Sequence, residues 1–538
     1  MPYYKDLGEY LEALRKHGLL VSIKRQVNKD TELHPLVRLQ FRGLPEEQRK
    51  AFLFENVIDS KGRRYTIPVL VSALAGSTKI YALGMKCKPE EITEKWNQSL
   101  SHPIEPIIVE NGPVHEEVHV GDALLQHGGL DEFPIPVSTP GYDVAPYMTA
   151  PCWISKDPET GILNAGTYRG QIKSPTRTGI MVASQDKHLA KHWNKCRKLG
   201  IPLQAAIVVG APPSVCYASV TRIPFEISEF ACAGGIAGEP LEVVRCKTVD
   251  LTVPAHAEIV IEGELSTDEV EPEAPFGEAM GYMGQREMMP YFTVKCITHR
   301  RKPIWLAYLS QFPPSESSKI RGVGWESRVY KHVKYELNVP QLKAVSWHES
   351  TGSCGVVVFQ FEGAEQSEIW RVLEHLSTWL TKNIVHAIKF IIAVDEDIDP
   401  SDADAVNWAI SFRVQPHRDC RTKTFPATSL MDYSVMPPGG ALERDMRYER
   451  MPDASNLLIN ATRKWPYPPV SLPKREFMER AIKMWKEEKL PELRLKGPWF
   501  GYNLGYWTDE YEEQALLAVK GEAHKTGEVL ATRRKKVD

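Results

Sequence analysis

The spacing of apolar residues at the start of the chain predicts a small α/β unit. An amphipathic helix should open the chain and stop at Gly18, and its apolar face would consist of Leu7, Tyr10, Leu11 and Leu14. Apolar runs at 52–54 and 65–71 are typical of strands, and 89–100 is typical of a helix. We therefore expect an N-terminal α/β domain at residues 1–114.

The pattern changes beyond about residue 105, where short apolar runs are separated by Gly and Pro. Residues 300–303 predict a hairpin turn into a strand at 304–308. Many short strands with few long helices favour a barrel or a sandwich, here over residues 115–320. The other predicted strands are 146–155, 162–172, 203–210, 241–247, 257–265 and 291–298.

After Pro313 strand-like and helical segments alternate, which predicts a parallel α/β layer. Strands are expected at 355–361 and 390–394, and Ser367 is expected to cap the helix between them. That helix would bury Ile369, Val372, Leu373, Leu376 and Leu380. Further helices are predicted at 477–488 and, capped by Thr508, from Asp509 onward. We expect a C-terminal α/β domain with a helical, aromatic-rich tail at 321–538.

Composition narrows the class of protein. The chain has 538 residues, 42% of them hydrophobic and 25% charged, with a formal net charge of −3. No global basic field attracts nucleic acid or anionic lipid. The nine cysteines form no Cys-x-x-Cys pair, the N-terminus lacks an apolar signal segment, and no apolar run approaches the ~20 residues of a membrane span. These features predict a cytoplasmic protein with reduced thiols and no nucleic-acid or membrane partner.

Two motifs suggest chemistry that their context does not support. His115-Glu116-Glu117-Val118-His119 matches the H-E-x-x-H pattern of zinc proteases, which requires both histidines on one helical face. Gly and Pro precede the motif, and valines alternate through it as in an edge strand, so we reject a helical zinc site there. The Gly-rich turn expected at 231–238 lacks a dinucleotide-binding frame.

The segment Glu271-Pro-Glu-Ala-Pro-Phe-Gly-Glu278 holds Glu273 and Glu278 on a stretch that cannot be helical. Its two prolines remove backbone donors, and Gly277 permits a sharp turn. Two carboxylates held on a stiff segment suit general acid–base chemistry, since their environments can separate their pKa values. An acidic surface loop is the alternative interpretation of these eight residues.

A second set of residues could bind a divalent ion. Strand alternation at 163–169 would place Asn164 and Tyr168 on one face and Arg169 on the other. His188 lies in a helical stretch, and Glu229 precedes the Gly-rich turn. Amide, imidazole and carboxylate ligands suit Mn²⁺, Mg²⁺ or Fe²⁺. A structural histidine on a helix is the alternative to this metal site.

Four features, taken in chain order, resemble the UbiD family of reversible decarboxylases. They are the run Asn164–Arg169, the helix with His188, Glu229 followed by Gly-rich chain, and the segment Glu273–Glu278. The resemblance covers roughly residues 5–470 and also includes Leu251–Gly263, Val394–Asp399 and Asn407–Ala409. It implies a central split β-barrel that binds prenylated FMN and a C-terminal domain that forms a homo-oligomer, a dimer or a hexamer. It also implies a flavin prenyltransferase as the supplier of the cofactor.

The resemblance assigns residues to three groups. Asn164, His188 and Glu229 would bind the divalent ion, Mn²⁺ with Fe²⁺ or Mg²⁺ as alternatives. A potassium ion would lie beside Ala218, Ser219, Thr221 and Glu229. The cofactor would contact Thr149, Gly166, Thr167, Tyr168, Arg169, Lys187, His188, Ser219 and Glu229.

The same resemblance makes Arg169, Glu273 and Glu278 a catalytic Glu–Arg–Glu triad. Substrate carbon would bond to the cofactor, CO₂ would leave, and Glu278 would deliver the proton. Arg169 would bridge both carboxylates and orient the substrate carboxylate, while Glu273 would tune Arg169 and relay protons. Glu278 must be neutral to donate, so an apolar setting that raises its pKa is expected.

The implied substrate is an aromatic or α,β-unsaturated carboxylic acid. Lys187 and Ala279 depart from the ferulate-type relatives, which carry Gln and Met there. An added cation and a wider pocket suit a bulky anionic substrate, such as an aromatic acyl-CoA of the phthaloyl-CoA type. Two alternatives stay open, an FMN-dependent oxidoreductase on a split barrel and a subunit of a multi-subunit aromatic carboxylase.

Overall fold

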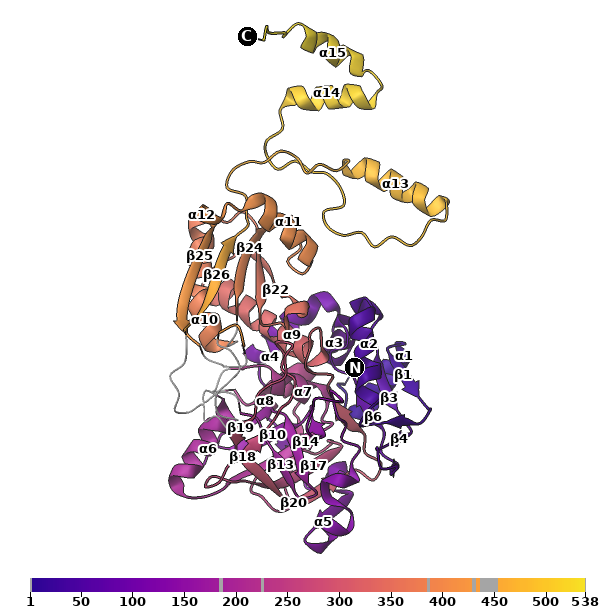
Figure 1. The fold of residues 1–538 in the computed structure, drawn as a ribbon, viewed down its shortest axis with the longest axis vertical. Helices are drawn as coiled ribbons and strands as arrows, with labels where there is room; N and C mark the ends of the chain where they lie inside the picture. The colour runs from indigo at the N-terminus through magenta and orange to yellow at the C-terminus, as the bar shows by residue number, and fades with distance from the viewer. Residues whose placement is uncertain are drawn as a thin grey trace.

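A computed structural model describes residues 2–182, 187–223, 227–384, 388–427, 432–435 and 453–537 (Figure 1). The chain forms a mixed α/β protein of several sheets and a C-terminal arm that extends away from the body (Figure 1). All nine cysteines are free. Among the described helices, none combines the length and the apolar character needed to cross a bilayer.

The N-terminal sheet takes its last strand from far along the sequence. Its order is β1-β3-β6-β21, and β21 (Trp305–Ala307) pairs in parallel with β6 (Val69–Val71). The expected hairpin through 300–303 is therefore wrong, because β21 leaves the central sheet instead of folding back on it. All three β21 residues are buried, so both of its faces must be covered.

The remaining N-terminal elements largely follow the predicted pattern. Helix α1 (Leu7–Lys16) buries the four predicted residues and is capped by Asp6, whose side chain accepts from the backbone N–H of Glu9. The expected strand 65–71 is divided into β5 (Arg64–Tyr65) and β6. The other elements are β1 (Leu20–Ile23), α2 (Leu33–Gly43), β3 (Ala51–Phe54), α3 (Thr78–Met85) and α4 (Ile92–Ser101).

The central sheet is an antiparallel half-barrel with the order β11-β10-β14-β17-β20-β13-β12-β9, and β8 joins it at β20. Seven consecutive register pairs join β14 to β17. The strands are β8 (Glu117–Val120), β9 (Tyr147–Met148), β10 (Cys152–Lys156), β11 (Leu163–Thr167), β12 (Gly170–Ser174), β13 (Arg177–Gly179), β14 (Leu203–Val209), β17 (Ile259–Leu265) and β20 (Tyr291–His299).

The Gly-rich segment expected as a turn is instead the helix α8 (Glu229–Ala237), which ends at Gly238 with φ 76°. Its glycines allow close packing on α4 and on the chain that follows α4. A Cβ on Gly234 would lie 2.4 Å from the carbonyl oxygen of Ile104, and one on Gly235 would lie 2.7 Å from that of Ser99. The glycines thus serve helix packing, which overrides their low helix propensity.

The C-terminal sheet has the order β22-β23-β24-β26-β25, with β23, β24 and β26 parallel. Helix α10 (Gln366–Asn383) buries the five predicted apolar residues, but its N-cap residue is Glu365. The cap predicted at Ser367 is therefore wrong, since Ser367 lies inside the first turn. The strands are β22 (Leu342–Trp347), β23 (Val356–Phe361), β24 (Phe390–Asp395), β25 (Cys420–Pro426) and β26 (Asp453–Asn460).

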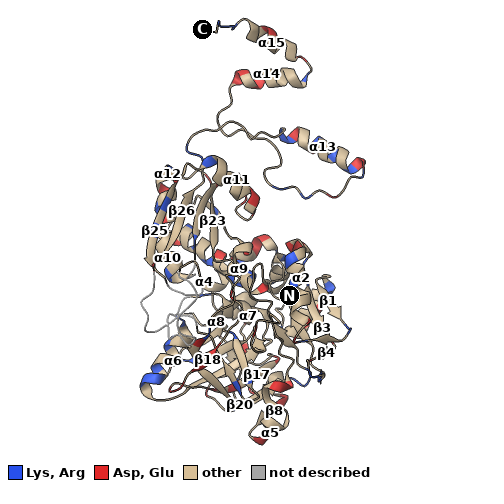
Figure 2. Cartoon of the chain, in the orientation of Figure 1, with Lys and Arg blue, Asp and Glu red and all other residues tan. Residues whose placement is uncertain are grey.

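Two main cores hold these layers together. One continuous cluster of buried residues runs from Tyr3 to Ile320 and joins the N-terminal elements to the half-barrel. A second cluster, from Trp325 to Leu458, lies beneath the C-terminal sheet. Helix α9 (Glu316–Lys331) contributes to both. Acidic and basic side chains are interspersed over the elements (Figure 2), in line with the net charge of −3.

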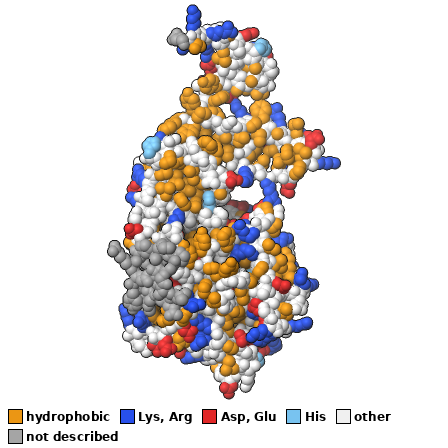
Figure 3. Space-filling model, viewed as in Figure 1, with side chains coloured by type: hydrophobic (Ala, Val, Ile, Leu, Met, Phe, Trp, Pro, Cys, Tyr) orange, Lys and Arg blue, Asp and Glu red, His pale blue; other side chains and the backbone are white. Residues whose placement is uncertain are grey.

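The C-terminal arm has almost no core of its own. Helices α13 (Arg475–Glu487), α14 (Asp509–Val519) and α15 (Ala523–Ala531) contain no buried residue, and hydrophobic side chains lie open along the arm (Figure 3). The Tyr502 hydroxyl donates to Oδ2 of Asp397 at 2.9 Å and ties the base of the arm to the body. Thr508 caps α14 as predicted, accepting from the N–H of Tyr511.

Removing residues 508–538 should leave the body intact, because the ion pairs of α14 and α15, such as Arg533–Glu510, lie within the arm. We expect a melting temperature within about 2 °C of the full chain, since about 1 kcal/mol shifts large domains by only a few degrees.

Arg413→Met provides the contrast in the same melting assay. Arg413 is 1% exposed and pairs with Asp395 and Asp397. Asp395 keeps its ion pair with Arg463, but the loss of Arg413 leaves the Asp397 carboxylate, 7% exposed, without an ion-pair partner among the described residues and should cost about 3–5 kcal/mol. A truncated chain that melts as early as this variant would show that the arm supports the body.

Candidate active site

The sequence-predicted site residues meet around one cavity of about 320 Å³. Its walls come from β11, the start of α6 (His188–Leu199), the end of α7 (Pro213–Val220), the start of α8, the segment 276–279 and one face of α9. The predicted residues that line it are Thr149, Asn164, Gly166, Thr167, Tyr168, Arg169, Lys187, His188, Ser219, Thr221, Glu229 and Glu278. Ala218 is fully buried behind this lining.

Arg169 lies between two carboxylates that are distant in the sequence. Its Nε and Nη2 donate to the two oxygens of Glu273 at 3.0 and 2.8 Å, and its Nη1 donates to Oε1 of Glu278. The Glu273 side chain is fully buried and lies behind Arg169, whereas that of Glu278 is 16% exposed and lines the cavity. The bidentate contact fixes the guanidinium plane, so the third contact has a defined direction.

Burial sets the protonation of this triad. It raises the pKa of Glu278 above its usual range, although the Arg169 charge opposes the rise. Two anions on one buried guanidinium would leave a net negative charge, and a proton on Glu278 removes it. Burial alone would lower the pKa of Arg169. The carboxylates of Glu273 and Glu278 stabilise its positive charge and raise the pKa overall. The arrangement therefore favours the protonated form of the carboxyl at the cavity wall.

Short-range backbone structure brings the two glutamates to Arg169. Glu273 ends β18 (Glu271–Glu273), which pairs with β19 (Glu287–Met289), and the intervening chain folds into a turn in which the Glu278 N–H donates to the carbonyl oxygen of Tyr282 at 2.8 Å. A Cβ on Gly277 would lie 2.7 Å from Cγ of Gln311, so only glycine fits this turn. The segment is non-helical, as predicted.

The three proposed metal ligands lie where two helices begin. His188 and Glu229 are the first residues of α6 and α8, and Asn164 lies on the facing strand β11. Glu229 Oε2 accepts from the N–H of Ala165 at 3.0 Å, which holds the carboxylate beside Asn164. Burial raises the pKa of Glu229 to about 7 and lowers that of His188 to about 4. Helix N-termini carry positive potential and attract anions such as phosphate.

The predicted alternation of faces fails at the end of β11. The strand stops at Thr167, and Tyr168 and Arg169 leave the ladder before β12 begins. Asn164 and Arg169 therefore border the same cavity, although strict alternation assigned them to opposite faces. The Trp153 indole N–H donates to the freed carbonyl of Tyr168 at 2.8 Å and stabilises this break.

Three family profiles match the chain. They are the N-terminal domain of 3-octaprenyl-4-hydroxybenzoate carboxy-lyase at residues 11–100, its Rift-related domain at 107–312 and its C-terminal domain at 320–459. The chain belongs to the UbiD family.

Relatives and solved structures agree with this membership. The chain is 30% identical over 505 residues to a phenolic acid decarboxylase of Bacillus subtilis, covering 92% of this chain and 100% of that one. It is similar to the UbiD-class enzyme HmfF from Pelotomaculum thermopropionicum in complex with prFMN, at 27% identity and TM-score 0.73, covering 87% and 97%. Vanillic acid decarboxylase of Sedimentibacter hydroxybenzoicus, at 24% identity, TM-score 0.74 and coverage of 90% and 100%, shares the fold. The chain is a carboxy-lyase of the UbiD type.

Sequence reasoning missed the contribution of α9 to this UbiD-family cavity. Ser317, Ile320, Arg321 and Trp325 line it from one helical face. Arg321 Nη2 donates to the carbonyl oxygen of Gly352 at 2.9 Å, and its guanidinium lies over the Trp325 ring. The spacing i, i+3, i+4, i+8 was readable from the sequence, but only the fold shows that this face meets the cavity.

The H-E-x-x-H segment contains no α-helix and ends in an edge strand, as predicted. Residues Pro113–His115 form a short 3₁₀ turn, and Glu117–Val120 form the strand β8.

A double-mutant cycle should show how strongly Arg169 and Glu273 depend on each other. Arg169→Met leaves a fully buried carboxylate without its bidentate partner and should destabilise the chain by about 3–5 kcal/mol. Adding Glu273→Gln removes the unpaired charge, so the double variant should be more stable than Arg169→Met alone. Denaturant unfolding of the wild-type chain, the two single variants and the double variant measures the coupling energy. If the two changes in the free energy of unfolding simply add, Arg169 and Glu273 do not form a coupled buried pair.

Proposed function

We propose that the chain is a prenylated-FMN-dependent enzyme that reversibly decarboxylates an aromatic or α,β-unsaturated carboxylic acid. The observation that carries the proposal is the Arg169–Glu273–Glu278 triad, which presents a carboxyl of raised pKa at the wall of a cavity. Family membership supports the reaction class, and the HmfF structure with prFMN supports the cofactor.

The cavity fits a phosphate-bearing cofactor with a divalent ion. Two helix N-termini face it, and two buried polar atoms, Nδ2 of Asn164 and Oγ1 of Thr221, have no hydrogen-bond partner among the described residues. Phosphate oxygens accept from such donors, and a divalent ion balances the phosphate charge. We assign Asn164, His188 and Glu229 to Mn²⁺, and Ser219 and Thr221 with Glu229 to K⁺.

The chain's own residues would bind the acid and manage its proton. Bound prenylated FMN would supply the electron sink for loss of CO₂. Arg169 has N–H groups beyond those that its two glutamates accept, and these would orient the substrate carboxylate. Glu278 would then donate its proton to carbon, and Glu273 would keep Arg169 in place.

Arg321 is the second candidate for substrate recognition. It lines the cavity, its charge acts on Glu278, and its buried Nε has no hydrogen-bond partner among the described residues. A buried donor without a partner is costly, and a substrate carboxylate would satisfy it. We therefore propose that Arg321 binds a carboxylate or phenolate group of the substrate.

The size of the substrate depends on two residues that depart from the ferulate-type relatives. Lys187 and Ala279 both line the cavity, one adding a cation and the other a small side chain. They support a bulky anionic aromatic substrate, including an aromatic acyl-CoA. Assays on matched free acids and CoA thioesters separate these two kinds of substrate.

The proposed partners follow from the cofactor and the arm. A flavin prenyltransferase would supply the cofactor, and the apolar arm supports a homo-oligomer. Mass and absorbance of the released cofactor distinguish prenylated FMN from the plain FMN of an oxidoreductase. Activity of the isolated chain distinguishes a complete enzyme from a subunit of a multi-subunit carboxylase.

Glu278→Gln should abolish decarboxylation, by at least about 10²-fold, because the amide cannot deliver a proton to carbon. Glu271→Gln, on the same segment but paired with Lys173 at 2.8 Å, is the matched control and should stay active. Cofactor content should be equal in both variants. The wild-type rate should fall as the pH rises through the raised pKa of Glu278, since the donor then loses its proton. Full activity of Glu278→Gln would remove this residue from the reaction.

Arg321→Met should raise KM by about 10–100-fold, the equivalent of about 1.5–3 kcal/mol for a charged hydrogen bond. Arg321→Lys keeps the charge and should recover part of the loss. Steady-state kinetics on purified holoenzyme separate KM from kcat. An unchanged KM in Arg321→Met would show that the substrate does not contact this side chain.

A further inference from the structure

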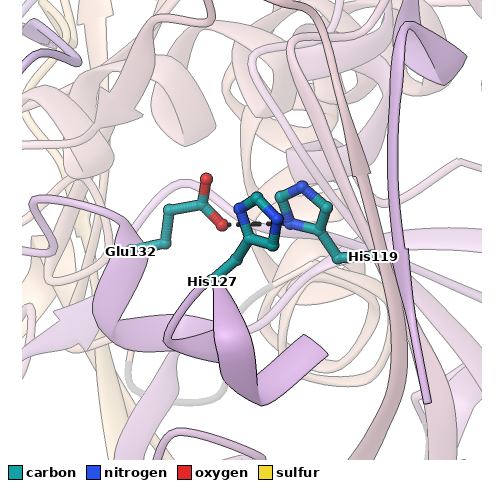
Figure 4. Close-up of side chains that lie close together, drawn as sticks. All are labelled: His119, His127 and Glu132. Atoms are coloured by element: carbon teal, nitrogen blue, oxygen red, sulfur yellow. Dashed lines mark ion pairs between the residues drawn. The ribbon is translucent and has the colours of Figure 1, made fainter. Parts of the chain in front are cut away.

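A cluster of three imidazoles and a carboxylate lies apart from the cofactor cavity, none of whose lining residues it includes. His119 comes from β8, His127 follows α5 (Asp122–Gln126), and Glu132 ends the 3₁₀ turn Gly129–Glu132 (Figure 4). The ligand atoms of these three lie within 4.8 Å of one another. His299, the last residue of β20, joins them, with its ring 5.0 Å from that of His119.

Glycines with positive φ bend the chain so that these residues meet. Gly121, at φ 60°, turns the chain from β8 into α5. Gly128 and Gly129, at φ 93° and 55°, reverse it again between His127 and Glu132. A Cβ on Gly129 would lie 2.2 Å from the carbonyl oxygen of Pro175, so this turn is pressed against the half-barrel. The fold therefore positions the cluster through specific backbone conformations.

The polar atoms at the centre of the cluster are incompletely paired. His119 Nδ1, Glu132 Oε2 and His299 Nε2 are buried and have no hydrogen-bond partner among the described residues. His119 Nδ1 lies 3.2 Å from Glu132 Oε2, and His299 Nε2 lies 3.5 Å from Glu132 Oε1. The side chains of His119 and His299 are only 5% and 7% exposed. Apart from these ion-pair contacts with one another, the three buried atoms have no polar partner among the described residues, so their lone pairs are open to a shared ion.

The second nitrogen of His299 defines which atom faces the cluster. Its Nδ1 lies 2.7 Å from the carbonyl oxygen of Arg300 and donates to it in the neutral ring. The lone pair of that ring is then on Nε2, which faces Glu132. A histidine whose outer nitrogen donates to a backbone carbonyl is oriented as metal-binding histidines are.

We propose that His119, His127, Glu132 and His299 bind one Zn²⁺ ion. Imidazole nitrogens with one carboxylate oxygen match the donors that zinc accepts in tetrahedral sites. Zinc–ligand bonds of about 2.0–2.1 Å place neighbouring ligand atoms about 3.3 Å apart. The Glu132 carboxylate lies near this distance from both histidines, through Oε2 to His119 at 3.2 Å and through Oε1 to His299 at 3.5 Å, so a rotation of the carboxylate presents one oxygen to the ion.

One ring must turn for all four ligands to converge. The rings of His119 and His127 are stacked, with centroids 3.8 Å apart and an angle of 18° between their planes. Lone pairs in parallel planes cannot point to one ion. His127 is exposed, so its ring can rotate and also provides the route from solvent. Zinc binding should therefore break this stack.

The proposed ion would link β8 and the chain after α5 to strand β20 of the half-barrel. Because protein atoms supply all four ligands, the site has the closed character of structural zinc. Its role would be to hold residues 117–132 on β20, and the decarboxylation chemistry would not require it.

The test measures zinc binding to the full-length chain in a His188→Ala background, which removes a proposed ligand of the cofactor metal. After chelator treatment, the protein is titrated with Zn²⁺ against a chromophoric chelator, and with Co²⁺ by visible absorbance. We expect one equivalent of tightly bound Zn²⁺ and the strong visible bands of tetrahedral Co²⁺.

Adding His127→Ala should weaken this binding by at least about tenfold, whereas His102→Ala, at another exposed histidine, should leave it unchanged. In the otherwise wild-type chain, His127→Ala should keep full decarboxylase activity. Zn²⁺ should raise the melting temperature of the wild-type chain and not that of His127→Ala.

Three results would overturn the proposal. The first is that no equivalent of Zn²⁺ binds tightly. The second is that the His127→Ala and His102→Ala proteins bind Zn²⁺ equally well. The third is that bound Co²⁺ shows the weak bands of octahedral coordination. Because His127 is exposed, its removal should not impair folding, and circular dichroism of the metal-free variants checks this. Glu132→Gln gives an independent loss of one ligand.

Discussion

A single buried guanidinium shared by two carboxylates is the interaction on which this structure depends. Glu273 is fully buried and Arg169 nearly so, and neither charge is tolerable there without the other. Their bidentate contact fixes Arg169 and leaves one edge of it for Glu278. The half-barrel, the β18–β19 pair and the turn at Gly277 must all be in place before the three groups meet. The triad therefore forms only in the folded central region.

The same charge balance explains why Glu273 and Glu278 differ although both contact Arg169. Glu273 has both oxygens occupied by Arg169, whereas Glu278 has one contact and a face toward the cavity. Burial then favours the protonated form of the acid with fewer contacts. The asymmetry arises from position along a short segment, since only four residues separate the two glutamates.

Much of the fold was predictable because apolar periodicity reports burial directly. The faces of α1 and α10 are those expected, and most predicted strands of the half-barrel are present. Errors arose where tertiary contacts override local signals. Glycine suggested a turn at 231–238, but close approach to α4 requires it within α8. A turn at 300–303 suggested a hairpin, but the next strand pairs with β6.

The sequence predicted those site residues that belong to motifs matching the UbiD family in chain order. The structure brings the matched residues to one cavity, but their roles rest on the proposal. Arg321 carried no motif, since a charged residue on a helix is ordinary until the helix is placed. His299 is likewise 180 positions from His119, and only the β8–β20 register brings them together. Long-range pairing is the information that local patterns lack.

The return of β21 to the first sheet has a consequence for recombining this protein with its relatives. A crossover near residue 110 would pair three strands from one parent with an edge strand from the other. Mismatched side chains would then meet inside a shared hydrophobic interior. Chimeras should instead exchange roughly the first 310 residues as one block. The smallest exchangeable unit is therefore larger than any single sheet.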